Sequence, residues 1–466
     1  MGPHSDPNGR LIADVARCCI PVDVSIPVTI SSQNNFMSDI KVNSVRFDGL
    51  LRHSIFGLAQ CALVLALLFS GAAHAEDVRG QGVAERQYEG YSAQGMRLGS
   101  FVLRPSLTVS ETYDSNVFAT SVDETDDFVT EINPNVVLES DWANHSVRLE
   151  LDAEQSLHAS QNDEDVLDWT AAASARVDVL SDTSVTVGFL YGSLSEERGS
   201  ADAIGAAAEP TEYEEMGATI AVSQSFNRLS AEVSAGYTVL DFEGTPLIGG
   251  GVANNDDRDR SVMEVAVQVG YELVADTVVF LRGTYNVRDY EQEVPVAVVD
   301  RDSDGYEVVV GTSFELGSLA TGEVFAGYQE QMFEDASFAP VSSLAFGAAV
   351  DWFVTPLTTA RLRADSAIED TTAGGASSFE RRSASVGVDH EFLRNLIASA
   401  DFEYAEEDFS STTRQDTTYD FELGVDYLIN QAFSVGVFYG YEQRDSSIIG
   451  DGFSRNVAGI RVRSAL

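Results

Sequence analysis

Alternation of apolar and polar residues with a period of two, over unusually long runs, constrains the fold of this chain most. In residues 419–427, aromatic and aliphatic residues occupy every second position, with acidic residues and a glycine between them. A period of two predicts a β-strand. Residues 432–445 repeat the pattern after a short polar break near Asn430. The two runs together predict an antiparallel hairpin.

The length of these runs indicates a membrane. Each spans about 10 to 14 residues, whereas strands of soluble domains have about 5 or 6, and a tilted strand that crosses a bilayer needs about 9 to 11. After residue 75, no apolar run approaches the roughly 18 residues of a membrane helix. Because only helices and closed barrels satisfy their backbone polar groups in lipid, the sequence predicts a barrel.

One long apolar run lies near the start of the chain. Residues 55–69 form an apolar core, basic residues precede it, and a small-x-small cleavage pattern ends at Ala75. We therefore predict that residues 37–75, beginning at Met37, are a cleaved secretory signal peptide. Residues 1–36 are then over-annotated upstream sequence.

Composition excludes several classes of function. The chain has 74 acidic and 28 basic side chains, a net charge of -46, so we expect no nucleic-acid partner, which would require clustered Lys and Arg. Cys18, Cys19 and Cys61 all precede residue 76. An exported chain without cysteine is not a disulfide scaffold.

The remainder divides into two parts. Residues 76–99 are polar, Gly-rich and unpatterned, and we predict a flexible periplasmic arm. Residues 100–466 contain about 18 strand-like runs, an even number as bacterial single-chain barrels require. These runs are 100–113, 127–142, 146–160, 166–180, 184–197, 213–226, 229–242, 261–274, 277–291, 305–317, 321–333, 342–354, 358–369, 379–392, 396–409, 417–429, 432–445 and 453–466.

The connections between runs alternate strictly between short and long. Outer-membrane barrels have short periplasmic turns and longer outer loops. The predicted fold is therefore all-β, a transmembrane antiparallel up-and-down β-barrel with both ends of residues 100–466 in the periplasm. A soluble sandwich or propeller would also have an apolar inner face, but not long strands with alternating turn lengths.

The alternation assigns one face of each strand to lipid and the other to the interior. In residues 146–157, for example, Val147, Leu149 and Leu151 would face lipid. The predicted lumen-lining residues are Arg148, Glu150, Asp152, Glu154, Arg176, Glu264, Glu272, Arg282, Glu307, Glu315, Arg361, Arg363, Arg381, Asp401, Glu403, Asp420, Glu422 and Asp426. Such an acidic lumen would attract cations and repel anions.

Aromatic residues near the ends of the runs predict two girdles at the membrane interfaces. Trp142, Phe226, Trp352, Phe392 and Tyr427 would lie near the short turns, and Tyr113, Tyr191, Tyr290, Phe333 and Tyr441 toward the long loops.

Four segments resemble one known family. The sequences TYDSNVF (112–118), NNDDRDR (254–260), RDSDGYEV (301–308) and DHEFLRNL (389–396) are similar to outer-membrane proteins grouped as putative beta-barrel porin type 2, common in alphaproteobacteria. The resemblance runs from about residue 100 to the end. It implies a role in passage of exopolysaccharide, and it carries no catalytic residues.

Metal and catalytic motifs are weak. Residues 300–305 imitate the start of an EF-hand loop, but the twelfth position is Gly311 instead of the bidentate Glu. We predict no specific metal site and no cofactor, only weak binding of divalent cations by acidic outer loops. His158, between Ser156 and Ser160, is the one histidine toward an outer rim that a hydrolase could use. We predict that the protein is not an enzyme.

The leading hypothesis is an outer-membrane channel that passes ions, small solutes or exopolysaccharide through a cation-preferring lumen, with lipid as its surroundings. Barrels of about 16 to 18 strands usually leave an aqueous channel. The first alternative is a closed structural or surface-interaction barrel with a salt-bridged interior and cation-binding outer loops. The second is an outer-membrane hydrolase.

Overall fold

The computed structural model describes residues 80–291 and 300–466. The predicted signal peptide and upstream segment lie outside these residues. Within them, no helix has the length and apolar character needed to cross a membrane.

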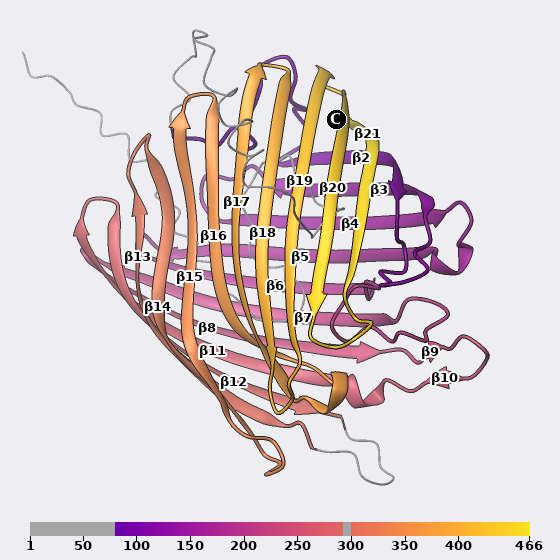
Figure 1. The fold of residues 1–466 in the computed structure, drawn as a ribbon. Coiled ribbons are helices and arrows are strands. Elements are labelled where there is room, and N and C mark those ends of the chain that lie inside the picture. The colour runs from indigo at the N-terminus through magenta and orange to yellow at the C-terminus, as the bar shows by residue number, and fades with distance from the viewer. Residues whose placement is uncertain (1–79, 292–299) are drawn as a thin grey trace, which may run out of the picture.

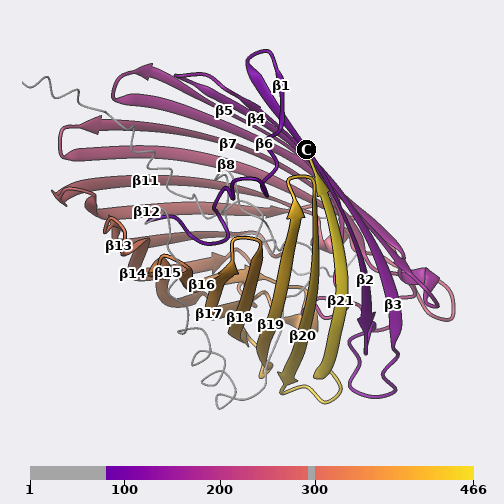
Figure 2. The ribbon, with the colours of Figure 1, turned by 90° about the horizontal axis from the view of Figure 1, so that it is seen from above.

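Eighteen antiparallel strands form a closed ring, as the period-two runs predicted, and the short strand β1 adds to its edge. Figures 1 and 2 show the tilted strands enclosing one central space. The ring strands are β2 (Phe101–Asp114), β3 (Asp127–Ser140), β4 (Ser146–His158), β5 (Val166–Leu180), β6 (Thr183–Ser195), β7 (Glu212–Phe226), β8 (Leu229–Phe242), β11 (Arg260–Val274), β12 (Thr277–Tyr290), β13 (Ser303–Glu315), β14 (Ala320–Phe333), β15 (Val341–Thr355), β16 (Thr358–Asp370), β17 (Ser378–Leu393), β18 (Leu396–Phe409), β19 (Gln415–Asn430), β20 (Phe433–Ser446) and β21 (Phe453–Ala465).

Each ring strand lies within two residues of its predicted boundaries at both ends. Turn chemistry explains this agreement at the short turns: Asn227 and Asp276 adopt positive φ values of 57° and 60°, and Asn and Asp tolerate this conformation better than most residues. The sequence did not indicate the short strands and turns of the loops. These are β1 (Met96–Leu98), β9 (Thr245–Pro246), β10 (Val252–Ala253), η1 (Asn162–Glu164), η2 (Asp256–Arg258) and η3 (Ala373–Gly375).

The ring closes where β21 pairs with β2. The yellow β21 lies beside the indigo β2 in Figure 1. This pairing covers only Ser106–Asp114 of β2, and the Leu466 amide donates to the Pro105 carbonyl oxygen at its end. Below that point, β1 pairs with Phe101–Leu103, so the edge that β21 leaves uncovered is protected.

The outer face of the ring is apolar. On most ring strands, large exposed side chains occupy alternate positions of one parity, such as Val435, Val437 and Tyr439 on β20. The opposite parity carries polar residues and small apolar clusters, including the buried Phe280, Val309 and Ala345 on β12, β13 and β15. Since lipid is the solvent of an outer-membrane barrel, this inverted pattern is the one expected.

All five aromatic residues that were predicted to form the girdle at the short-turn end have exposed side chains. At the other end the prediction for Tyr290 was wrong. Tyr290 is buried and lies 5.7 Å from the Arg260 guanidinium. Outward positions on β12 are odd-numbered, as in Leu281 and Tyr285, so an even-numbered residue faces inward.

The amino-terminal arm differs from the prediction of a flexible segment over residues 76–99. From residue 80 onward it folds against the barrel, and Val83 is fully buried. In Figure 2 the indigo chain that leads into β1 runs within the ring of strands. The sequence of this segment has no periodicity, so its packing depends on contacts with distant strands.

Candidate functional site

The inner wall of the barrel carries the predicted lumen-lining residues. Every one of the eighteen lies on the strand face opposite to the exposed apolar side chains, from Arg148, Glu150, Asp152 and Glu154 on β4 to Asp420, Glu422 and Asp426 on β19. Glu272, Glu315 and Arg148 lie near the strand ends beside the short turns, on β11, β13 and β4. The strand face agrees with the prediction, and the lining of an open lumen by these residues stays a prediction.

Many charges of this wall form ion pairs, some within one strand and others between strands. The predicted arginines all have acidic partners, and each pair neutralises charge on the wall. The pairs are Arg148 with Glu150 (2.9 Å), Arg176 with Asp178 (3.2 Å), Arg282 with Glu307 (4.0 Å) and Glu323 (3.4 Å), Arg361 with Asp389 (3.4 Å) and Asp401 (2.8 Å), Arg363 with Asp351 (2.7 Å), and Arg381 with Glu403 (2.9 Å).

One stretch of the wall is acidic without compensation. Glu131 on β3, Glu154 on β4 and Asp168 on β5 form no ion pair with an arginine among the described residues. Ser110 donates to Glu131 at 2.6 Å, and Ser195 donates to Asp168 at 2.6 Å. The electrostatic neighbours of Glu154 are carboxylates only, including Glu131 and Asp168. We call Glu131, Glu154 and Asp168 the acidic wall.

The β6–β7 connection, residues 196–211, makes contacts across the long-loop end of the barrel, and we call it the crossing loop. Near its origin, Arg198 Nε donates to Glu164 of η1 at 2.7 Å. Arg258 of η2 donates to the Glu196 carboxylate at 2.7 Å and packs 4.1 Å over the Phe242 ring. These residues are largely buried, so the start of the loop is held firmly.

The far side of the crossing loop reaches strands that are not its neighbours in the ring. Asp202 Oδ1 accepts hydrogen bonds from the β16–β17 connection, at 2.6 Å from Thr371 Oγ1, 3.0 Å from the Thr372 amide and 2.9 Å from the Ala373 amide. Around the ring, β8 and β11 to β15 lie between β7 and β16. In the other direction, through β6 and β5, more strands lie between them. The loop therefore spans the mouth of the barrel.

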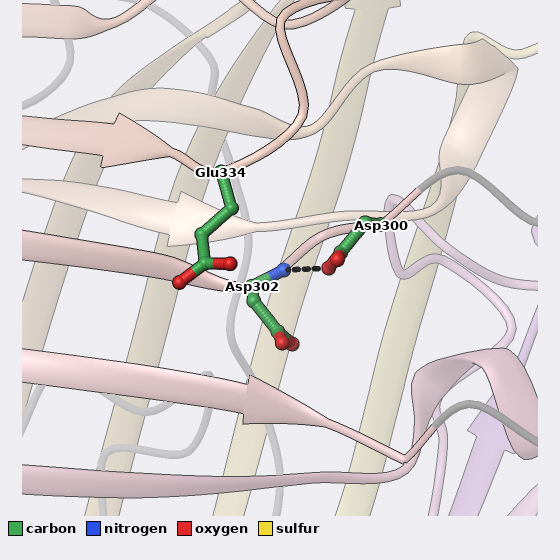
Figure 3. Close-up of side chains that lie close together, drawn as sticks. All are labelled: Asp300, Asp302 and Glu334. Carbon is green, nitrogen blue, oxygen red and sulfur yellow. Dashed lines mark hydrogen bonds between the residues drawn. The ribbon is translucent and has the colours of Figure 1, made fainter.

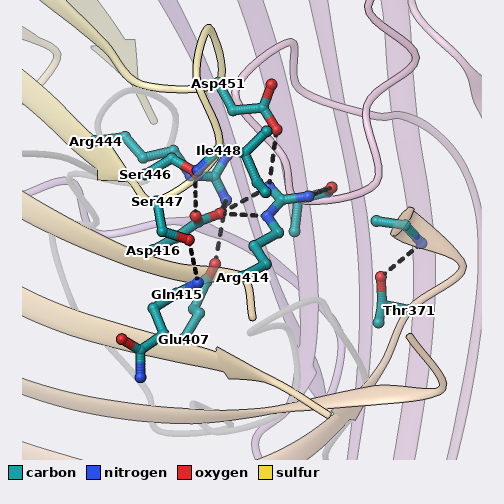
Figure 4. Close-up of polar contacts among 12 residues, drawn as sticks. Thr371, Glu407, Arg414, Gln415, Asp416, Arg444, Ser446, Ser447, Ile448 and Asp451 are labelled. Carbon is teal, nitrogen blue, oxygen red and sulfur yellow. Dashed lines mark hydrogen bonds and ion pairs between the residues drawn. The ribbon is translucent and has the colours of Figure 1, made fainter. Parts of the chain in front are cut away.

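Two arginines of the opposite wall hold the same loop through its carbonyl oxygens. Arg444 Nη1 donates to Gly199 O at 2.5 Å, and Arg414 Nη1 donates to Ala201 O at 3.3 Å. Asp416 lies between these two guanidinium groups, 2.7 Å from Arg414 and 3.3 Å from Arg444 (Figure 4). The shared carboxylate fixes both donors, because each guanidinium is a rigid planar fork.

Sequence reasoning missed the acidic wall residues Glu131 and Asp168, although the alternation of β3 and β5 places both on the inner face. It also missed Asp202, Arg414 and Arg444. The first two could have been found by applying the parity rule to every strand. The last three bond across the mouth, and local periodicity carries no signal of such contacts.

A cluster of three carboxylates lies at the outer ends of β13 and β14. Asp300, Asp302 and Glu334 bring ligand atoms within 4.8 Å of one another, and the Asp302 amide donates to Asp300 at 3.0 Å (Figure 3). Burial raises the pKa of Asp302, and the neighbouring Asp300 adds to this. Since Ser303–Glu315 is strand β13, the EF-hand imitated by the sequence does not form here.

His158, the residue considered for hydrolysis, has an acidic neighbour. Its Nδ1 lies 3.5 Å from Asp165 Oδ1, and the Asp165 carboxylate also accepts the His158 amide at 2.6 Å. The serines beside it in sequence make no hydrogen bond with its ring among the described residues. This geometry lacks the contact between nucleophile and base that a serine hydrolase uses.

Comparison with known proteins gives one family. The sequence model of the family described as Putative beta-barrel porin 2 matches residues 89–466. No curated protein matches this sequence.

Several solved outer-membrane proteins have a similar arrangement. Pseudomonas aeruginosa OpdK with vanillate has 11% identity and a TM-score of 0.41, covering 78% of this chain and 99% of that chain. Pseudomonas aeruginosa OccK2 (OpdF) in complex with glucuronate has 12% identity and a TM-score of 0.42, covering 78% and 98%. The siderophore receptor PirA from Acinetobacter baumannii has 7% identity and a TM-score of 0.41, covering 78% and 80%.

Proposed function

This chain belongs to the putative beta-barrel porin 2 family, whose model matches its residues 89–466, and on that premise we propose that it passes small cations and neutral solutes passively. Its place is the outer membrane, and its barrel is porin-like. The proposal adds a preference for cations and for small solutes, and it assigns no catalytic step to the chain.

The acidic wall is the observation that carries this proposal. Elsewhere on the inner face, many carboxylates form ion pairs with arginines or have arginines among their electrostatic neighbours, as Glu264 has Arg282 and Arg288. Glu131, Glu154 and Asp168 have neither among the described residues. Glu197 of the crossing loop is another of the acidic neighbours of Glu154. A cation that passes between the loop and this wall would meet negative charge from both sides, which favours cations over anions.

Small solutes fit this geometry better than a polymer does. The crossing loop spans the outer mouth and is bonded to the far wall through Asp202, Arg414 and Arg444. An extended polysaccharide would have to pass the loop without displacing these contacts. We therefore favour small solutes over exopolysaccharide, and an open passage along β3 to β5 over a barrel closed on every side.

The test is ion selectivity of the exported chain, residues 76–466, refolded and inserted in a planar bilayer under a salt gradient. We expect a stable conducting level with a cation-selective reversal potential. The triple variant Glu131→Gln, Glu154→Gln and Asp168→Asn should lose much of that selectivity and keep its conducting level.

A control variant removes two formal charges from the outer face, against three from the inner face in the triple variant. Glu214 and Glu330 face outward, where Tyr191 donates to Glu214 at 2.9 Å and Tyr306 to Glu330 at 2.8 Å. The variant Glu214→Gln, Glu330→Gln should retain wild-type selectivity. Folded protein that never conducts, or anion selectivity in the wild type, would reject the proposal and favour the closed barrel.

A further inference from the structure

We propose that the amino-terminal arm is a plug that occludes the part of the short-turn mouth lined by β16 to β19, and that releasing it enlarges the passage. The regulatory half of this inference rests on the proposed channel function. The placement of the arm stands on contacts that are independent of conduction.

The arm has an apolar anchor inside the barrel. Val83 and Tyr88 form a buried cluster with Ile397 of β18, and Tyr91 and Leu428 pack against it. Val83 is 0% exposed. A segment that lay free in the periplasm would leave these apolar side chains in water, which the hydrophobic effect disfavours.

Polar contacts fix the same segment to neighbouring strands. Arg86 Nη1 lies 3.3 Å from Glu391 Oε2 of β17, and the two side chains are only 3% and 10% exposed. The Val83 amide donates to Thr359 Oγ1 of β16 at 3.0 Å. Within the arm, the Tyr88 hydroxyl donates to Val83 O at 3.0 Å. Burial raises the pKa of Tyr88, and the Glu391 carboxylate adds to this.

The partners of the arm all face the interior. Thr359 shares its parity with Arg361 on β16, Glu391 with Asp389 on β17, and Ile397 with Asp401 on β18. The arm therefore lies inside the ring and not beneath its rim. At Gly80 it also approaches the β13–β14 turn, because an added Cβ there would stand 3.1 Å from Gly317 O.

Inner-wall groups near the arm are shielded from water. Asp389 is 2% exposed, Ser399 is 6% exposed and Asp426 is 7% exposed, so these groups are poorly accessible to water with the arm in place. The contacts that residues 80–92 make with the barrel fall on β16 to β18 and on the β13–β14 turn. These elements are separate from β3 to β5, which carry the acidic wall. The plug thus leaves that side of the mouth to the solute.

A single charged contact makes the plug releasable. A buried ion pair that loses one partner leaves an uncompensated charge, so the remaining group is drawn back toward water. Arg86→Gln would leave Glu391 without its cation in the apolar surroundings of the arm. Arg97 offers a matched control on the same arm, because its ion pair with Asp141 is largely exposed, at 73% and 49%.

The first readout is chemical labelling. Residues 76–466 contain no cysteine, so Ser399→Cys introduces one thiol on the inner wall beside Ile397. We expect a water-soluble maleimide to label it at least tenfold faster when Arg86→Gln is added, and at an unchanged rate when Arg97→Gln is added. Val83→Asp, which places a charge in the buried cluster, should act like Arg86→Gln and serves if that variant folds poorly.

The second readout is conductance of the same variants without the added cysteine. Arg86→Gln and Val83→Asp should raise the single-channel conductance above that of the wild type, whereas Arg97→Gln should not. Equal labelling rates in all variants would overturn the plug, whatever the current. Slow labelling of the wild type with no current from any folded variant would count against the channel function and leave the placement of the arm supported. Faster labelling with unchanged conductance would overturn the regulatory half.

Discussion

Asp202 and Thr371 start from connections on different sides of the barrel and meet in a hydrogen bond of 2.6 Å across the outer mouth. The same carboxylate oxygen accepts two backbone amides of the β16–β17 connection. A charged acceptor with three donors is a strong attachment, since each such bond contributes about 1.5–3 kcal/mol.

Asp202→Ala should release the far end of the crossing loop. We expect local opening to become easier by about 2 kcal/mol, which corresponds to roughly 30-fold faster amide exchange in residues 199–203. The open channel should also fluctuate more. Asp256→Ala is the matched control, because among the described residues the Asp256 carboxylate accepts a hydrogen bond only from the side chain of Asn254, two positions away in the same loop. Unchanged exchange in Asp202→Ala would show that other contacts hold the loop.

A buried ion triad ties β11 and β12 to β16. Arg288 Nη1 lies 2.5 Å from Asp370 Oδ1, and Arg260 Nε lies 3.4 Å from Asp370 Oδ2. Asp370→Ala would leave two buried guanidinium groups facing each other, and breaking such a pair costs about 3–5 kcal/mol. We expect a loss of about 3 kcal/mol in the free energy of unfolding, measured by denaturant titration in detergent micelles.

The double variant Arg288→Met, Asp370→Leu should recover part of that loss. It removes the charge together with its counter-charge and leaves Arg260 stacked near Tyr290. A double variant less stable than Asp370→Ala alone would contradict the assignment of the cost to an unpaired charge.

The inner cluster of β12 to β15 depends on a glycine that leaves space for two aromatic rings. A Cβ on Gly311 would overlap the Phe280 ring and stand 2.7 Å from Phe325 Cβ. Gly311→Ala should therefore destabilise the barrel by about 1–3 kcal/mol through overpacking. Gly283→Ala, one strand away with no atom within 4 Å of the added Cβ, should be close to neutral. Equal effects of the two substitutions in a denaturant titration would exclude this explanation.

The outer mouth should become more stable as the pH falls from 7.5 to 5. Burial raises the pKa of Asp259 to about 6, and the nearby Asp241 and Asp256 add to this. A carboxyl group whose pKa is higher in the fold than its ordinary value near 3.9 favours folding when protonated. The gain therefore begins as the pH falls through about 6 and is complete below about 4.

Amide exchange at Phe242 reports this change, because its N–H donates to Asp259 Oδ1 at 2.7 Å. After correction for intrinsic rates, protection should be greater at pH 5 than at pH 7.5. Asp259→Asn keeps an acceptor oxygen and removes the titration, so its protection should vary less with pH. The same pH dependence in both proteins would assign the effect to other groups.

The sequence predicted the ring of strands well because lipid outside and polar groups inside impose the same alternation on every strand. Glu154 and Asp426 could be assigned to the inner face from that rule alone. The inward position of Tyr290 was not predicted, because an aromatic residue near a strand end can belong either to a girdle or to an inner contact. Only the parity of Tyr290 on β12 distinguishes the two positions. Val83 and Asp202 bond to residues that are far away in the chain, at Thr359 and Thr371. No local sequence pattern predicts contacts of this kind.

The pairing of β2 with β21 has a consequence for how the barrel forms. It joins nine residue pairs, against fourteen between β2 and β3, and its partners lie some 340 to 360 positions apart in the chain. Loop closure over such a separation carries the largest entropic cost of any pairing in the ring. We therefore expect folding to finish at this junction and a barrel under stress to part there first, where β1 shields the exposed end of β2.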